Sequence, residues 1–146
     1  MKKIILIVLM AVFSYGQSVF NNPQPTFEKP RNVVINMHEN DLDVVNHTIG
    51  SIYNILKEYP SESLKVVVVL YGKGMRIVKK DYDKATINRI KSLMEYDVEF
   101  IGCRNTMETM NWTEDDFIDG VDYVQAGIVE IIEKQGITAE QISDDP

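Results

Sequence analysis

The 146-residue sequence has a single cysteine, Cys103, and therefore lacks the means to form a disulfide within the chain. It also lacks a basic stripe, since 22 acidic residues against 15 lysines and arginines give a formal net charge of −7. This acidity argues against nucleic acid and anionic membranes as partners, because both repel a negative surface. Paired cysteines and closely spaced histidines are missing too, so neither a metal nor an obligatory cofactor is expected.

One long apolar run is present, and it lies at the start of the chain. Two lysines precede about ten apolar residues, and Ser14 and Gly16 then provide the small side chains of a cleavage site before Gln17. The run is short for a permanent membrane span. We therefore predict a secretory signal peptide over residues 1–16, with an uncleaved anchor as the alternative. The mature protein is expected to be periplasmic or otherwise exported, without stable membrane insertion.

The remaining 130 or so residues have the usual size of one domain with one core. Residues 17–31 contain three prolines and little periodicity, which indicates an extended N-terminal leader. Residues 32–136 are expected to form a single α/β domain, and residues 137–146 an acidic tail. Loss of Lys2 and Lys3 with the signal peptide would take the formal net charge from −7 to −9.

Strand and helix patterns alternate four times in the predicted domain. The β-branched run at residues 64–70 is typical of a strand that is covered on both faces of a parallel sheet. Apolar positions spaced by three and four residues predict amphipathic helices, and in the last of these Ile128, Ile131 and Ile132 are expected to face inward. Strands are predicted at 32–37, 64–70, 98–101 and 121–124. The longer helices are predicted from a cap at Asp41 or Asp43 to Tyr59, at 84–95 and at 126–135. This alternation predicts an α/β fold with a mainly parallel sheet of four to five strands.

Cys103 lies where the predicted strand 98–101 gives way to a short helix that ends near Asn111. In an open α/β sheet, ligands bind at the carboxyl ends of the strands. The peptide dipoles at the start of a helix favour an anion, which for a cysteine means the reactive thiolate. The alternative is that this lone cysteine is simply a small buried hydrophobic residue.

Loops after the other strands should meet Cys103 at the same edge. His38 could accept the thiol proton or donate to a bound sulfur anion, or it is simply a hydrogen-bonded loop residue. Gly72 and Gly74 would let backbone N–H groups approach an anion, and Lys73 adds positive charge; the alternative is a tight turn that needs positive φ. Arg104 could stabilise the thiolate or form a salt bridge on the face of the helix.

Three segments together resemble the DsrE/DsrF-like sulfur-relay family. They are Lys-Val-Val-Val-Val-Leu-Tyr-Gly-Lys-Gly-Met at 65–75, Val-Glu-Phe-Ile-Gly-Cys-Arg-Asn-Thr at 98–106 and Asp-Gly-Val-Asp-Tyr-Val-Gln-Ala-Gly-Ile-Val-Glu at 119–130. The resemblance implies a flavodoxin-like three-layer sandwich that assembles as a homotrimer or hexamer. It also implies that Cys103 carries sulfur as a persulfide between partners. Gly72, Gly74 and Asn105 match family positions.

These observations lead us to expect a periplasmic sulfur carrier of the sulfurtransferase type. Cys103 would accept sulfane sulfur from a donor protein or a small sulfane-sulfur compound and pass it to an acceptor. The first alternative is a non-enzymatic oligomeric module that binds a small ligand or a protein and in which the cysteine is buried and structural. The second is a redox sensor that dimerises through its cysteine.

Overall fold

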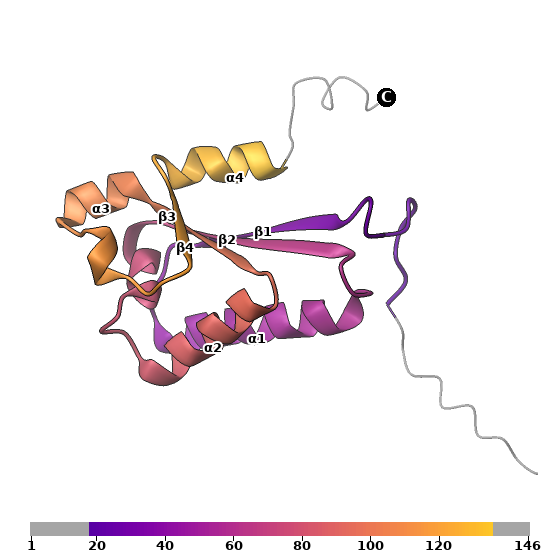
Figure 1. The fold of residues 1–146 in the computed structure, drawn as a ribbon, viewed down its shortest axis with the longest axis horizontal. Coiled ribbons are helices and arrows are strands. Elements are labelled where there is room, and N and C mark those ends of the chain that lie inside the picture. Colours follow the sequence, from indigo (N-terminus) through magenta and orange to yellow (C-terminus); the bar gives the residue numbers. More distant parts are fainter. Residues whose placement is uncertain (1–17, 136–146) are drawn as a thin grey trace, which may run out of the picture.

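Four parallel strands form one sheet in the computed structural model of the chain, which describes residues 18–135 (Figure 1). The strands are β1 (Arg31–Met37), β2 (Leu64–Leu70), β3 (Glu99–Cys103) and β4 (Val121–Val124), and their order across the sheet follows their order in the chain. Met37 pairs with Leu70, Leu70 with Gly102, and Cys103 with Val124. The carboxyl ends of all four strands therefore meet at one edge of the sheet.

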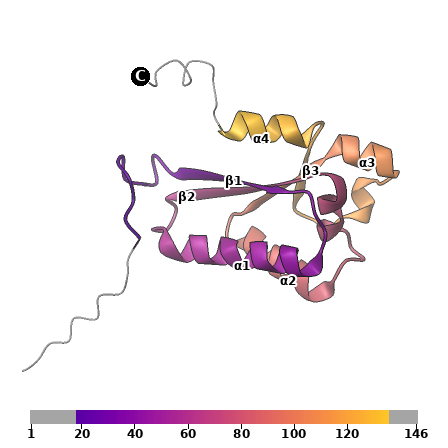
Figure 2. The ribbon, with the colours of Figure 1, turned by 180° about the vertical axis from the view of Figure 1, so that it is seen from behind.

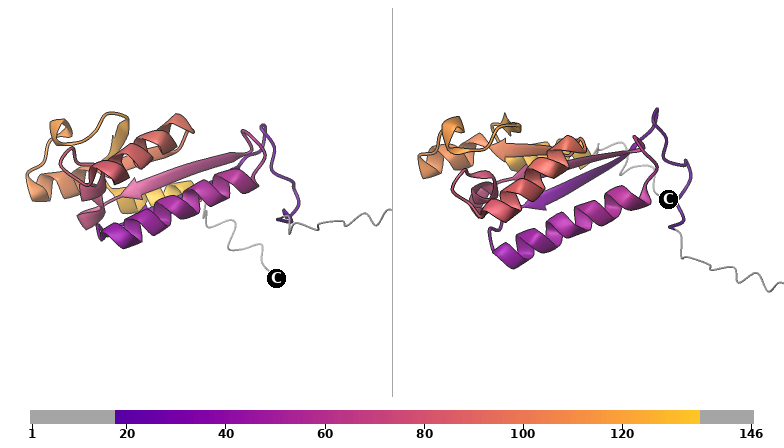
Figure 3. Two further views of the ribbon diagram at one scale, coloured as in Figure 1. Left: turned by 90° about the horizontal axis from the view of Figure 1, so that it is seen from below. Right: turned by 60° about the horizontal axis from the view of Figure 1, so that its bottom comes forward.

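Helices cover both faces of this sheet. Figures 1 and 2 show α1 (Leu42–Glu58) and α2 (Lys84–Glu95) on one face and α4 (Gly127–Gln135) on the other, and Figure 3 shows α1 and α2 running along the same face. Aspartates begin the two long helices, because the Asp41 carboxylate accepts two backbone N–H groups of α1 and the Asp83 carboxylate accepts one of α2. The short helices η1 (Gly72–Val78), α3 (Arg104–Met110) and η2 (Glu114–Asp116) gather at the end of the molecule where the strands finish.

The side chains of β2 alternate between two cores, which explains its unbroken apolar sequence. The larger core lies beneath α1 and α2 and includes the fully buried Ile49, Leu93 and Phe100. The smaller core lies beneath α4 and consists of Val67, Val69, Ile101 and Ile131. Full burial of one such aliphatic or aromatic side chain stabilises a fold by about 1.5–3 kcal/mol. The sheet is thus the middle layer of a three-layer structure.

The predicted α/β class and parallel sheet are confirmed, and the arrangement is consistent with a flavodoxin-like fold. Two local predictions at the carboxyl ends of the strands were wrong. β3 continues to Cys103 instead of ending at Ile101, because Gly102 and Cys103 both pair with β4. The glycine segment begins the 3₁₀ helix η1 and is not an open loop.

Helix α4 buries a narrower stripe than its sequence predicts. Ile131 is buried against the sheet, whereas Ile128 and Ile132 are 51% and 50% exposed. The prediction that all three isoleucines face inward was therefore wrong. Figure 1 shows α4 above this face of the sheet with the short α3 near its N-terminal end, and the exposed isoleucines leave the flanks of α4 open.

The leader folds back against the domain. The Arg31 guanidinium donates to the carbonyl oxygens of Asn21 at 2.6 Å and Pro23 at 2.9 Å. The rings of Phe20 and Tyr59 lie 4.6 Å apart between centroids, which places the leader beside the end of α1. The predicted signal peptide and acidic tail lie outside the described residues. None of the helices described here has the length and apolar character needed to cross a membrane.

Candidate functional site

Cys103 is the last residue of β3 and directly precedes α3, and only 5% of it is exposed. Its Sγ accepts a hydrogen bond from the backbone N–H of Gly127 at 3.4 Å. Gly127 is the first residue of α4, which the neighbouring strand β4 delivers to this edge of the sheet. The sulfur therefore lies at the N-terminal ends of two helices, α3 and α4, whose dipoles both favour negative charge there.

Close packing explains why residue 127 is a glycine. A Cβ atom built at this position would lie 3.3 Å from the Cβ of Cys103 and 3.3 Å from Cγ1 of Val69. A larger residue would push the start of α4 away from the sulfur. The glycine thus lets a backbone N–H come within hydrogen-bonding distance of the thiol.

Thr106 connects the thiol to the glycine segment. The Gly72 N–H donates to Oγ1 of Thr106 at 3.0 Å. A hydroxyl that accepts one hydrogen bond still has its own proton to donate. The hydroxyl and the backbone N–H of Thr106 both lower the pKa of the Cys103 thiol, so this residue acts on the thiol while it holds the start of η1.

Burial and hydrogen bonding act on Cys103 in opposite directions. Burial raises the pKa of the thiol, because it removes water from around the charged form. The N–H groups of Gly127, Thr106 and Asn105 and the Thr106 hydroxyl lower it, and their combined effect leaves the pKa of Cys103 below its ordinary value. When protonated, the thiol donates to the Gln125 carbonyl at 3.7 Å. Such an electropositive setting is typical of reactive cysteines.

Asn105 joins the two helix starts that surround the sulfur. Its backbone N–H donates to the Gln125 carbonyl at 3.1 Å, and its Oδ1 accepts from the Gln125 side-chain amide at 2.6 Å. This pair of hydrogen bonds ties the first turn of α3 to the loop that precedes α4. The side chain of Asn105 therefore has a positioning role.

The glycine segment lies at the predicted edge, but its N–H groups already have partners. Gly72 donates to Thr106, and Gly74 donates at 3.0 Å to the carbonyl three residues before it. Gly72 has a φ of +53°, which matches the tight-turn alternative. A Cβ at Gly74 would lie 2.1 Å from the Met37 carbonyl oxygen, so this glycine lets η1 pack on β1. The side chain of Lys73 is exposed.

His38 lies in the loop after β1, where it stacks on Tyr71 with 5.8 Å between ring centroids. Its Nε2 lies 3.8 Å from Oε1 of Glu39, and more than half of its side chain is exposed. The hydrogen-bond partners of the Cys103 sulfur among the described residues are the Gly127 N–H and the Gln125 carbonyl. The structure thus brings His38 to the same edge of the sheet without pairing it with the thiol.

Arg104 forms a salt bridge, which was the second of the two roles considered for it. Its guanidinium pairs with the Glu114 carboxylate at 2.7 Å and lies 5.3 Å from the centre of the Tyr123 ring. Both contacts orient the positive charge of Arg104 away from Cys103. In the part of the chain that the structure describes, no group of three His, Cys, Asp or Glu side chains could hold a metal ion.

The sequence-based prediction missed three residues that surround the sulfur: Thr106, Gln125 and Gly127. Two of them lie in the loop after β4 or at its end, and the carboxyl end of a fourth parallel strand belongs to the same edge as the other three. The sequence could therefore have indicated that the loop after β4 belongs to the site. The role of Thr106 was harder to predict, because it depends on how the 3₁₀ helix η1 meets α3.

Comparison with known proteins places this site in a family. The model of the DsrE/DsrF-like family matches residues 33–143, which include Cys103, all of α3 and the residues around the thiol. The fold is similar to the solved structure of MTH1491, a protein of unknown function from Methanobacterium thermoautotrophicum, with a TM-score of 0.66 and 28% identity over 72% of this chain and 91% of that one. No curated protein matches the chain. Because the family model covers well over half of the sequence, the chain belongs to the DsrE/DsrF-like family.

Proposed function

We propose that this protein is a sulfur carrier in which Cys103 holds sulfane sulfur as a persulfide. Membership of the DsrE/DsrF-like family suggests sulfur relay at the level of the family. The observation that carries the proposal for this chain is the convergence of two helix N-termini on one sulfur, with the Gly127 N–H 3.4 Å from Sγ. The same groups that favour a thiolate would also favour the negative outer sulfur of a persulfide.

The transfer needs no external oxidant or reductant. The Cys103 thiolate attacks the outer sulfur of a donor persulfide; a new S–S bond forms, and the donor S–S bond breaks with its electron pair leaving on the donor thiolate. In the second step an acceptor thiolate attacks the outer sulfur, and Cys103 leaves as a thiolate. A lowered pKa assists this second step, because a less basic thiolate is a better leaving group.

The direct test is intact-mass measurement after incubation with inorganic polysulfide. The wild-type protein should gain the mass of one or more sulfur atoms, and a thiol reductant should remove them. Cys103→Ser should gain nothing, and its circular dichroism should show that it is folded. If the folded wild-type protein forms no reducible sulfur adduct, the carrier proposal fails.

Burial of Cys103 favours a second candidate, a non-enzymatic binding module with a structural cysteine. Alkylation of the thiol by iodoacetamide separates the two. A carrier should react in the native state at a rate that increases as the thiolate forms. A structural cysteine should react only as fast as the protein unfolds, so that its native rate would track the unfolding rate in dilute urea.

We also propose that the protein is exported to the periplasm and assembles as a homotrimer or hexamer. The predicted signal peptide supports export. Three apolar side chains of α4 support self-assembly, since Ile128, Val129 and Ile132 are each about half exposed on one helix. Sequencing of the mature N-terminus should give Gln17, and sedimentation analysis should show the assembly. A protein that retains Met1 would contradict export with cleavage, and a protein that sediments as a monomer would contradict self-assembly.

A further inference from the structure

The edge of β1 that faces away from β2 has no strand beside it in the part of the chain that the structure describes. On its other side β1 pairs with β2 along its whole length of seven residues. A free edge of this kind presents a row of backbone N–H and C=O groups that lack a ladder partner. It is therefore a surface on which another strand could extend the sheet.

The backbone hydrogen bonds of β1 fix which residues point their groups toward this open edge. The Arg31 N–H donates to a carbonyl just before β2 at 2.9 Å, and the Met37 carbonyl accepts from an N–H just after β2 at 3.2 Å. Because successive residues of a strand direct their backbone groups to opposite sides, the odd-numbered residues of β1 pair with β2. The outward groups are those of Asn32, Val34 and Asn36.

The order of these three outward residues is the same in both directions. Two copies of β1 that run antiparallel, with a two-fold axis at Val34, would place Asn32 of each copy opposite Asn36 of the other. Opposed residues whose groups point toward each other exchange N–H···O bonds, so every outward N–H and C=O would find a partner. A shift of two residues would place an asparagine opposite a valine, and a shift of one would turn the groups of one strand away.

Side chains on both faces of β1 match in the same register. On the α4 face, Val34 packs beside the smaller core, and Asn32 and Asn36 are exposed. Their amide groups would donate and accept across the pair, while the two valines meet between them. On the α1 face, the partly buried Val33 would lie opposite Ile35 of the second copy. Cross-strand pairs of these kinds stabilise a sheet.

The charges at the two ends of β1 also favour antiparallel pairing. Glu28, Lys29 and Arg31 give the start of the strand a net positive charge, whereas Glu39 and Asp41 make the segment after its end negative. An antiparallel pair brings the start of one strand beside the end of the other, so opposite charges meet at both ends. Residues 32–37 are uncharged, so the middle of the contact escapes the repulsion expected between copies of an acidic protein.

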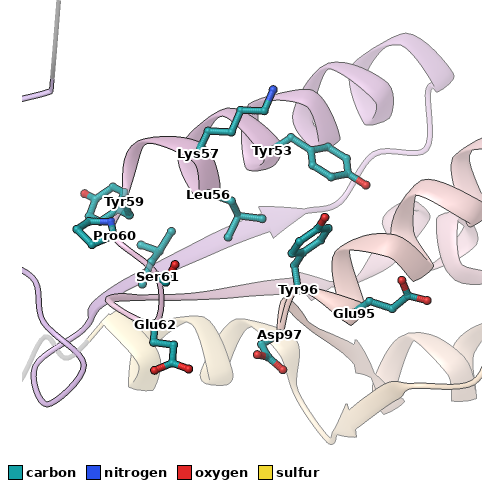
Figure 4. Close-up of a pocket in the computed structure, with 11 residues that line it drawn as sticks. Tyr53, Leu56, Lys57, Tyr59, Pro60, Ser61, Glu62, Glu95, Tyr96 and Asp97 are labelled. Carbon is teal, nitrogen blue, oxygen red and sulfur yellow. The ribbon is translucent and has the colours of Figure 1, made fainter.

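A pocket of about 440 Å³ lies elsewhere on the molecule, between the ends of α1 and α2 (Figure 4). The carboxylates near it, those of Glu62, Glu95 and Asp97, are exposed and point away from its tyrosine rings. None of the residues that line the pocket belongs to β1. The open edge of β1 is therefore a surface distinct from this pocket.

We propose that two copies of the chain pair through their β1 strands and join their sheets into one continuous sheet. The contact is isologous, because the same edge serves in both copies. It rests on the proposed self-assembly and deepens it, since a hexamer made of two trimers needs a two-fold contact in addition to the three-fold one. Sulfur transfer at Cys103 plays no part in this contact.

A cysteine at the two-fold axis tests the register directly. In Val34→Cys, made in a Cys103→Ser background, the two new thiols would belong to an opposed pair with Cα atoms about 5.5 Å apart, which suits a disulfide. Mild oxidation should convert most of this protein to a covalent dimer that a reductant separates again. Ile35→Cys is the matched control, because it lies opposite Val33 and not opposite its own copy, and it should crosslink far less.

Two results of the crosslinking would overturn the proposal. Equal crosslinking of the Val34→Cys and Ile35→Cys variants would show that the register is wrong. A Val34→Cys variant that stays monomeric under oxidation would show that the edge is unpaired or that another segment of the same chain occupies it.

Charged residues at Asn32 and Asn36 separate the two-fold contact from the rest of the assembly. Asn32→Lys with Asn36→Lys would place like charges opposite each other, so sedimentation should show half the wild-type mass, a trimer in place of a hexamer. Asn32→Lys with Asn36→Glu would place opposite charges there and should keep the wild-type mass. Both side chains are exposed, so urea unfolding should show that each variant is folded.

The masses distinguish failure of the β1 contact from failure of self-assembly. A wild-type trimer that neither double variant changes would overturn the β1 contact and leave self-assembly standing. A wild-type monomer would overturn both. An equal loss of mass in the two double variants would contradict the pairing of Asn32 with Asn36.

Discussion

Replacing Thr106 by valine should raise the pKa of Cys103 with little change in shape. The threonine hydroxyl accepts from the Gly72 N–H at 3.0 Å and lowers the pKa of the Cys103 thiol, and valine has no hydroxyl to do either. A hydrogen bond contributes about 0.5–1.5 kcal/mol net, and about 1.4 kcal/mol corresponds to a factor of ten. At a fixed pH below the pKa, the thiolate-to-thiol ratio should therefore fall roughly twofold to tenfold.

The pH dependence of iodoacetamide alkylation measures this change, because the thiolate is the reactive form and the chain has one cysteine. Thr106→Ser keeps the hydroxyl and should retain the wild-type midpoint. Thr109→Val is the matched control on α3, because the Thr109 hydroxyl donates to the Asn105 carbonyl and not to the sulfur. An unchanged midpoint in Thr106→Val, or an equal shift in Thr109→Val, would refute the effect of the Thr106 hydroxyl on the pKa of Cys103. Urea unfolding should confirm that each variant is native at every pH used.

Three further predictions concern the same edge of the sheet and its supports. Wild type should gain stability relative to Cys103→Ala as the pH rises toward 9.0, because the unfolded thiol keeps its proton up to that value while the folded thiol loses it earlier; a pH-independent difference in urea unfolding would contradict this. Gly74→Ala should destabilise the fold by about 3 kcal/mol, since its Cβ would lie 2.1 Å from a carbonyl oxygen of β1. Gly50→Ala lies within α1, free of close contacts, and should stabilise the fold by about 0.5–1 kcal/mol. If both variants changed the thermal unfolding temperature by similar amounts, the packing argument would be refuted. Arg104→Gln should cost less than about 1 kcal/mol by loss of its exposed pair with Glu114 and should leave the alkylation midpoint unchanged; a raised midpoint would instead show that Arg104 acts on the sulfur.

The sheet could be predicted from sequence because each strand leaves a local signature. The apolar run at 64–70 requires cover on both faces, and the structure supplies α1 and α2 on one side and α4 on the other. The orientation of α4 was less predictable. Burial of Ile128 and Ile132 depends on what packs beside α4, and the spacing of apolar residues along the sequence does not reveal this.

The position of the thiol was predictable, but most of its partners were not. Cys103 follows a strand, and this alone places it at the edge where parallel strands end. Arg104 is adjacent in sequence, yet successive residues of a helix point in different directions, so its charge pairs with Glu114 instead. The Gly127 contact requires the register of β3 against β4, in which Cys103 faces Val124. Such cross-strand register is a property of the folded sheet.

The parallel βα architecture gives the two ends of this molecule opposite electrostatic character. Each long helix begins at the edge where the strands end and runs back toward the edge where they start, so positive dipole ends lie at the edge that holds Cys103 and negative ends at the opposite edge. A thiolate or persulfide fits the first environment, because the positive ends of the helix dipoles stabilise a negative sulfur.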